Sequence, residues 1–149
     1  MEAIYAGILE KVSHLTYGVE SAETYVWIEN APESLFQDYL RIRKVKDLGG
    51  RAYIAIIPRY QEFTNIAVKL ASRDVHFVQV AGADAILITA TADTNWKYDL
   101  AKGNFLFSQD ILTKPELKRT ALECAVRDLH RVLNDLASRD ARVEHIYDY

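Results

Sequence analysis

The basic residues between positions 41 and 59 are the part of the chain best suited to bind a ligand. Five Lys or Arg residues and one acid fall between Arg41 and Arg51, a local excess of +4 in a chain whose formal charge is −3. Arginine presents a planar, permanently charged group that matches a phosphate or a carboxylate. This stretch predicts a site for a small anionic ligand, nucleotide-like or carboxylate. A solvated charged face is the simpler alternative.

Aromatic side chains and one histidine complete the predicted site. Tyr53 and Tyr60 lie near the basic residues in sequence and could stack on a base or a sugar. His76 alternates with Val75 and Phe77 on a predicted strand, so it faces away from their side. The predicted ligand-binding residues are Arg41, Arg43, Lys44, Arg51, Arg59, Tyr53, Tyr60 and His76.

The other reactive side chains do not form a recognised pattern. His14, His76, His130 and His145 are far apart in sequence and lack the short spacing of a zinc site. The single cysteine, Cys124, lies among apolar residues, so we expect it to be a small core residue rather than a nucleophile. No glycine-rich phosphate-binding motif is present. We therefore predict no catalytic residue, no metal and no cofactor.

Composition limits the classes of protein to which this chain can belong. Its 149 residues are 50% hydrophobic, which is enough for a packed core and excludes wholesale disorder. With 18 basic and 21 acidic side chains, nucleic-acid binding is not expected. No apolar run is long enough to span a membrane, and the first residues lack the pattern of a signal peptide. A lone cysteine fits a reducing compartment, so a cytoplasmic location is expected.

The first fifty residues allow more than one interpretation. Residues 3–15 fit a helix or a strand almost equally well, whereas residues 23–29 alternate like a strand. Asn30 and Pro32 then indicate the start of a helix. Residues 40–46 fit either the continuation of that helix or a strand, and Gly49-Gly50 is interpreted as the turn that ends it.

The rest of the chain shows a clearer alternation of strands and helices. Residues 51–57 predict a strand and residues 61–72 a helix, followed by two strands that Gly82-Ala83-Asp84 joins as a hairpin. A small second hairpin is expected within 96–108, and a long helix from Thr113 to Leu136. The last strand is expected over 143–147.

A five-residue echo links two of these segments. The residues Leu-Ala-Ser-Arg-Asp occur at 70–74 and again at 136–140, each time between a predicted helix and a strand. The common context favours a duplicated strand–helix–strand unit. Arg complements the helix end, and Ser and Asp favour the turn that follows.

These elements predict an α+β fold with a single domain over 1–149. Residues 51–148 follow the β-α-β-β-α-β order of a ferredoxin-like sheet with both helices on one face. The core would then comprise residues 51–149, and residues 1–50 would be an extension that packs on or extends the sheet. Because the opposite sheet face needs cover, we expect self-association through the sheet.

Three functions remain open on these grounds. The favoured one is a non-enzymatic, oligomeric regulatory or binding domain for a small anionic ligand. The second is a protein–protein interaction module of the inhibitor or immunity type. The third is a small enzyme whose site is assembled at a subunit interface, with His76 or His145 as the acid–base group.

Overall fold

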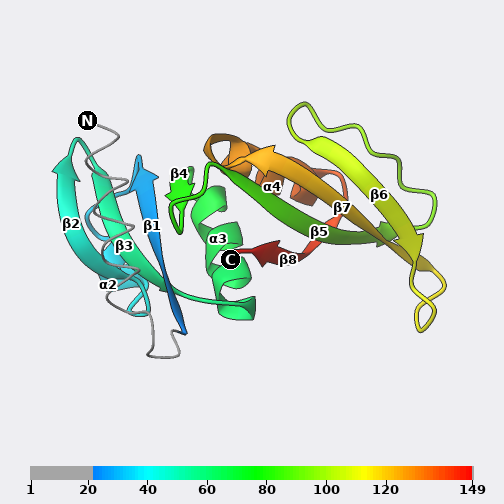
Figure 1. Cartoon of the computed structure of the whole chain (residues 1–149), viewed down its shortest axis with the longest axis horizontal. Helices are drawn as coiled ribbons and strands as arrows, with labels where there is room; N and C mark the ends of the chain where they lie inside the picture. Colours follow the sequence, from blue (N-terminus) through cyan, green and yellow to red (C-terminus); the bar gives the residue numbers. More distant parts are fainter. Residues whose placement is uncertain (1–21, 149) are drawn as a thin grey trace.

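Three of the four strands of the first sheet are rich in β-branched and aromatic residues, which favour strands; the edge strand β2 (Arg43–Gly49) is mostly charged. The computed structural model describes residues 22–148. The sheet is antiparallel throughout, with the strand order β2-β3-β1-β4 (Figure 1). Its strands are β1 (Glu23–Glu29), β2 (Arg43–Gly49), β3 (Ala52–Pro58) and β4 (His76–Val80). The structure confirms the strand predicted over 23–29 and places β3 within one residue of the strand predicted over 51–57.

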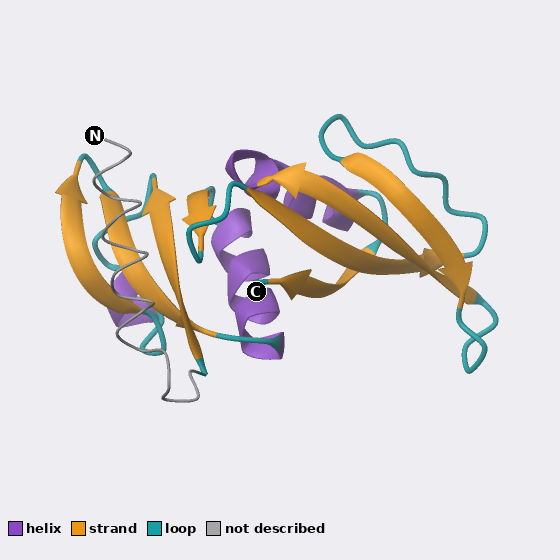
Figure 2. Ribbon diagram, viewed as in Figure 1, coloured by secondary structure: helices purple, strands orange, loops and turns teal. Residues whose placement is uncertain are grey.

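The second sheet is formed by the later half of the chain. It is also antiparallel, with the strand order β6-β7-β5-β8. Its strands are β5 (Ala85–Asp93), β6 (Asn104–Asp110), β7 (Leu117–Ala125) and β8 (Arg142–Tyr147). Figure 2 shows the two groups of strands as separate sheets, with a helix at the centre of the molecule.

That central helix is α3 (Gln61–Ser72), and it is the helix predicted over 61–72. Phe63, Ala67 and Leu70 recur at helical spacing and are completely buried. In the second half, a 3-10 turn, η1 (Val126–Asp128), leads into helix α4 (Leu129–Ser138), which also buries one apolar face. The remaining helix, α2 (Leu35–Asp38), has four residues.

The two halves of the chain have the same architecture. Residues 23–80, the first repeat, and residues 85–147, the second repeat, each contain three strands, a main helix and a last strand; the first repeat has the short helix α2 in addition. The sheet orders β2-β3-β1-β4 and β6-β7-β5-β8 are identical when equivalent strands are compared. The strand–helix–strand duplication predicted from the five-residue echo is thus part of a larger repeated unit.

The echo itself forms the same helix end in both repeats. Asp74 and Asp140 take left-handed backbone conformations, with φ of 61° and 62°. The amide of Val75 donates to the carbonyl of Leu70 at 3.0 Å, and the equivalent bond in the second repeat has the same length. This is the hydrogen bond of a Schellman helix end, and aspartate tolerates the positive φ better than most residues.

The repeats pack on one another through reciprocal contacts. Helix α3 packs against α4 and against β8, while α4 packs against β4. One cluster of buried apolar side chains includes members of both repeats, such as Phe63 and Phe77 from the first and Leu129 and Ile146 from the second. Each repeat therefore completes the core of the other. Within residues 22–148 no helix is both long and apolar enough to cross a membrane.

The α+β class is confirmed, but the single ferredoxin-like sheet over 51–148 is wrong. Strands β4 and β5 were expected to form a hairpin, yet they belong to different sheets and only an isolated bridge joins Val80 to Ala83. Strand β1 lies between β3 and β4, so β4 already has its partner. Ala81 and Gly82, both with positive φ, direct the chain away into the second sheet.

The long helix expected from Thr113 to Leu136 is also wrong in its first half. Residues 117–125 form the inner strand β7, paired with β5 on one side and β6 on the other. Leu, Lys, Ala and Glu are good helix formers, which is why the local sequence favoured a helix. Pairing on both edges overrides that preference, and helix α4 begins at Leu129.

Two smaller expectations are corrected in the same way. Gly49-Gly50 is the turn of the β2–β3 hairpin, not a helix end, and both glycines have positive φ. Residues 43–49 are therefore a strand, so of the two alternatives for residues 40–46 the strand is correct from Arg43 onward. Strand β6 pairs with β7 rather than with residues 96–100, which form no strand. The helix or strand expected over 3–15 lies outside the described residues.

Candidate functional site

A cluster of Asp74, His76 and His130 lies where the two repeats meet. Asp74 follows helix α3, His76 begins β4, and His130 lies in the first turn of α4. The Nε2 atom of His76 is 3.1 Å from Oδ1 of Asp74. The rings of His76 and His130 are stacked, with 3.9 Å between centroids and 21° between planes. One ligand atom from each of the three residues lies within 4.8 Å of the other two.

His130 is the buried member of this cluster. Its side chain is only 6% exposed, and its Nδ1 atom has no hydrogen-bond partner within the described part of the chain. Burial lowers the pKa of His130, and the neighbouring His76 lowers it further, so the neutral imidazole is favoured. A buried nitrogen without a partner is rare in folded proteins, and a bound ligand is one of its ordinary explanations.

The cluster opens into a cleft of about 660 Å³, which we call the histidine cleft. Besides the cluster, it is lined by two cations, Lys102 and Arg131, and by polar side chains of α4. Volumes of about 300–1,000 Å³ are typical of sites for small molecules. The cleft therefore combines a suitable size with titratable and charged groups.

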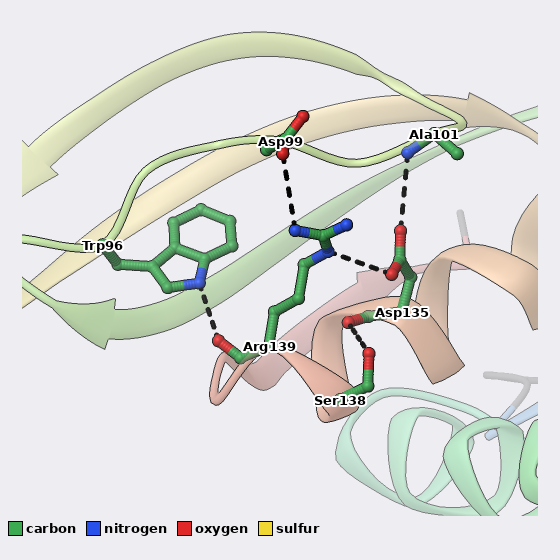
Figure 3. A network of polar contacts seen from close by, with 6 residues as sticks. All are labelled: Trp96, Asp99, Ala101, Asp135, Ser138 and Arg139. Atoms are coloured by element: carbon green, nitrogen blue, oxygen red, sulfur yellow. Dashed lines mark hydrogen bonds and ion pairs between the residues drawn. The ribbon is translucent and has the colours of Figure 1, made fainter.

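The loop between β5 and β6 contributes Ala101 and Lys102 to the lining of the histidine cleft. Polar contacts join this loop to α4 and to the residue after it (Figure 3). The indole Nε1 of Trp96 donates to the carbonyl of Arg139 at 2.8 Å, and the amide of Ala101 donates to Asp135 Oδ2 at 3.4 Å. Arg139 also pairs with Asp99 at 3.6 Å and with Asp135 at 3.1 Å. These contacts hold the backbone next to Lys102 against the helix.

An equivalent cleft of about 620 Å³, which we call the arginine cleft, also lies between the two repeats. It is lined by Asp140, Arg142 and Thr64, which occupy the positions of Asp74, His76 and His130 at an offset of 66 residues. The polar side chains of the arginine cleft differ from those at the equivalent positions of the histidine cleft in residue type and in hydrogen-bond partners. The hydroxyl of Thr64 accepts a buried hydrogen bond from the amide of Ile146 at 2.9 Å. Within residues 22–148, the buried polar atom at this position is hydrogen-bonded in the arginine cleft and lacks a partner in the histidine cleft.

The basic residues predicted to bind a ligand are placed elsewhere. Arg41 pairs with Glu62 at 3.0 Å, and Arg43 pairs with Glu23. Both ion pairs lie on the exposed surface around the first sheet, where such pairs contribute little to stability. Neither arginine lines the histidine cleft.

Arg51 has a partner inside the first repeat, and Arg59 has one just after β8, at the end of the second repeat. The Nε of Arg51 donates to the carbonyl of Ala31 at 3.4 Å. Arg59 lies 3.7 Å from the buried carboxylate of Asp148. Burial raises the pKa of Asp148, while Arg59 acts in the opposite direction.

The remaining predicted residues divide between core and surface. Tyr53 is buried in the main core, and its phenol pKa is raised chiefly by that burial. Lys44 lies over the rings of Phe36 and Tyr53, at 5.8 and 5.9 Å from their centroids. Tyr60 is half-exposed beneath the guanidinium of Arg59. Of the eight predicted residues, His76 alone lines the histidine cleft.

Cys124 is confirmed as a core residue, although it lies on β7 and not on a helix. It is 3% exposed and belongs to the main apolar cluster. Burial raises the pKa of its thiol to about 12, so the reactive thiolate is not populated near neutral pH.

Asp74, His130, Lys102 and Arg131 were not identified from the sequence. His76 and His130 are 54 residues apart and come from different repeats, so local spacing does not connect them. One signal was present: the five-residue echo ends at Asp74, and the residues after it differ between the copies.

Comparisons of the chain with family models, curated proteins and solved structures find no match.

Proposed function

We propose that this chain is a binding protein that holds a small anionic ligand in the histidine cleft. The ligand class is the one expected from the sequence, but the position is different. Lys102 and Arg131 would contact the anion, and His76 and His130 would line its floor.

This proposal rests on the ion pairs and hydrogen bonds of the charged side chains that line the histidine cleft. Of the two acids that line the cleft, Asp135 is paired with Arg139, whereas Asp74 accepts a hydrogen bond from the side-chain amide of Asn30 and lies beside His76. Lys102 and Arg131 have no ion pair with any residue between 22 and 148. Apart from the Asp135–Arg139 pair, two cations therefore face the single carboxylate of Asp74, and the net charge of the cleft is positive.

The chemistry of the two cations fits a carboxylate or a phosphate. Arginine offers a planar fork of donors and lysine a compact ammonium, and both form charge-assisted hydrogen bonds with anionic oxygens. A charge-assisted hydrogen bond contributes roughly 1.5–3 kcal/mol when its partner is present. Two such contacts in a cleft of this size would support binding without any catalytic group.

Calorimetric titration with inorganic phosphate, a nucleoside monophosphate and a dicarboxylate tests the proposal, on a chain freed of metal ions with a chelating resin and in a buffer without other anions that could compete. We expect at least one of these anions to bind, and the variants Lys102→Ala and Arg131→Ala each to weaken binding about tenfold. This fold-change corresponds to the loss of roughly 1.4 kcal/mol.

The matched control is Lys69→Ala, because Lys69 lines the arginine cleft at the position equivalent to Asp135. This variant should bind the same anion as tightly as the unmodified chain. The proposal is wrong if none of the anions binds, or if binding is unchanged in both Lys102→Ala and Arg131→Ala.

A further inference from the structure

We infer that Asp74, His76 and His130 form a binding site for one divalent transition-metal ion, for which zinc is the best fit. This inference goes beyond the proposed function, because its three ligands are different groups from Lys102 and Arg131.

The donor set is suited to such an ion. Two imidazole nitrogens and one carboxylate oxygen are ordinary ligands of Zn²⁺, and three protein ligands leave a coordination position open. Calcium and magnesium prefer sites made of oxygen atoms alone. The mixed nitrogen and oxygen set therefore favours zinc or a neighbouring transition metal over those two ions.

The distances are close to those of a formed site. Ligands bound about 2.1 Å from a tetrahedral zinc ion lie about 3.4 Å from one another. Asp74 Oδ1 and His76 Nε2 are already 3.1 Å apart, and the widest separation among the three ligand atoms is within 4.8 Å. The ion would lie between this nitrogen and oxygen, and the neutral imidazole of His76 would then carry its proton on Nδ1.

Binding requires one local movement. A metal ion lies in the plane of each imidazole that binds it, so two nearly parallel stacked rings cannot both point at the same ion. The ring of His76 must turn away from that of His130. Its side chain is 37% exposed and that of Asp74 is 72% exposed, so both can move without disturbing the core.

The state of His130 is an independent observation that points to a ligand. This side chain is more than nine-tenths buried at the floor of the cleft, and its Nδ1 has no partner among the described residues. The equivalent side chain in the arginine cleft, Thr64, makes a hydrogen bond to the backbone of β8. In the arginine cleft, the side chain at this position therefore makes a structural hydrogen bond. In the histidine cleft, Nδ1 of His130 makes none with the described residues.

Titration of the untagged, chelator-treated chain with Zn²⁺, followed by calorimetry in a buffer without other anionic ligands, tests this inference. We expect one ion to bind per chain. The variant Asp74→Asn should weaken binding at least tenfold and His76→Ala about a hundredfold. Asparagine also tolerates positive φ, so Asp74→Asn preserves the helix end. Both residues are partly exposed, so neither substitution opens a cavity in the core.

The controls are Asp140→Asn, at the equivalent turn of the arginine cleft, and His145→Gln, at a histidine outside the cluster. Both should bind zinc within twofold of the unmodified chain. The inference is overturned if no saturable binding occurs, if Asp74→Asn and His76→Ala bind normally, or if the controls lose binding equally. Lys102→Ala and Arg131→Ala should retain zinc, so the failure of either proposal is distinguishable from failure of the other.

Discussion

The histidine cleft and the arginine cleft are two versions of one construction. Each lies between the end of one repeat's helix and the start of the other's, and each has an aspartate with a left-handed backbone at its edge. In the first, the facing side chains are His76 and His130; in the second, they are Arg142 and Thr64.

The two clefts differ in whether the side chain on the helix accepts a hydrogen bond from the backbone of the facing strand. Thr64 accepts the amide proton of Ile146, so it holds β8 onto α3. At the equivalent place in β4, the amide of Val80 is directed to the carbonyl of Ala83 at 3.3 Å instead. The amide of Val80 is therefore not directed to His130. The scaffold thus positions a side chain at both places, and in the histidine cleft that side chain remains available to a ligand.

The largest effect is expected from breaking the core that the two repeats share. Phe63 in α3 is completely buried and occupies the position of Leu129 in α4. The substitution Phe63→Ala should lower the free energy of unfolding by about 3–5 kcal/mol. Urea denaturation followed by circular dichroism measures this change.

The same substitution shows whether the repeats are one cooperative unit. Trp27 lies in the first repeat and Trp96 in the second, so single-tryptophan variants report on each repeat separately. Because the core is continuous, we expect both probes to follow one transition, before and after Phe63→Ala. Two well-separated transitions would contradict the reciprocal packing of the repeats.

A smaller loss is expected when the hydrogen bond specific to the arginine cleft is removed. Thr64→Val leaves the buried amide of Ile146 without its acceptor, which typically costs about 1–3 kcal/mol. Thr64→Ser keeps the hydroxyl and should preserve most of the stability. If the valine and serine variants are equally stable, the hydrogen bond does not hold β8 as described.

The two clefts should also differ in their response to acid. The folded-state pKa of His130 lies below its ordinary value of about 6.5, chiefly because of burial, whereas Thr64 does not titrate. Above pH 6.5 His130 is neutral in both states. Below it, the unfolded chain takes up the proton first, so stability falls as the pH decreases towards the folded-state pKa.

Urea denaturation between pH 7.5 and 5.5, in the presence of a chelator, measures this effect. The variant His130→Asn should show a smaller loss of stability on acidification than the unmodified chain. An identical pH dependence in the two proteins would mean that the burial of His130 does not set its protonation.

The smallest effect concerns the outer strands of the two sheets. Strand β2 presents Arg43, Lys44 and Lys46, whereas the equivalent strand β6 exposes Phe105, Leu106 and Phe107 to about half of their area. Charged residues on an edge strand oppose its pairing with other chains. We expect Phe107→Lys to reduce concentration-dependent association in sedimentation velocity, and an increase would contradict this comparison.

The elements with a strong local period were predictable from the sequence. Residues 23–29 and 61–72 show strand and helix periods, and the structure confirms both elements. Residues 117–125 were mistaken for a helix because their individual preferences are helical, whereas β5 and β6 hold them as a strand. The division into two sheets depends on pairing between distant strands, such as β1 with β4, and no local pattern encodes it.

The candidate site was predictable in part. His76 was identified by its position on a strand between apolar neighbours, but its partners were not. Asp74 belongs to the echo and has a local role at the helix end, which conceals its place in a cluster. His130 lies on the other repeat, so only the packing of α4 against β4 brings it to His76. The high density of basic residues over 41–59 predicts an anion site there. In the structure, most of these residues are engaged in contacts around the first sheet.

The claim that Asp74, His76 and His130 bind one metal ion in the histidine cleft is tested most directly by the ¹H–¹⁵N correlation spectrum of the chain as Zn²⁺ is added. We predict that the amide signals of 74–76 and 130–131 shift and saturate at one equivalent, while those of Thr64, Asp140 and Arg142 stay in place. Equal shifts at the arginine cleft, or shifts confined to the basic strand β2, would contradict the account.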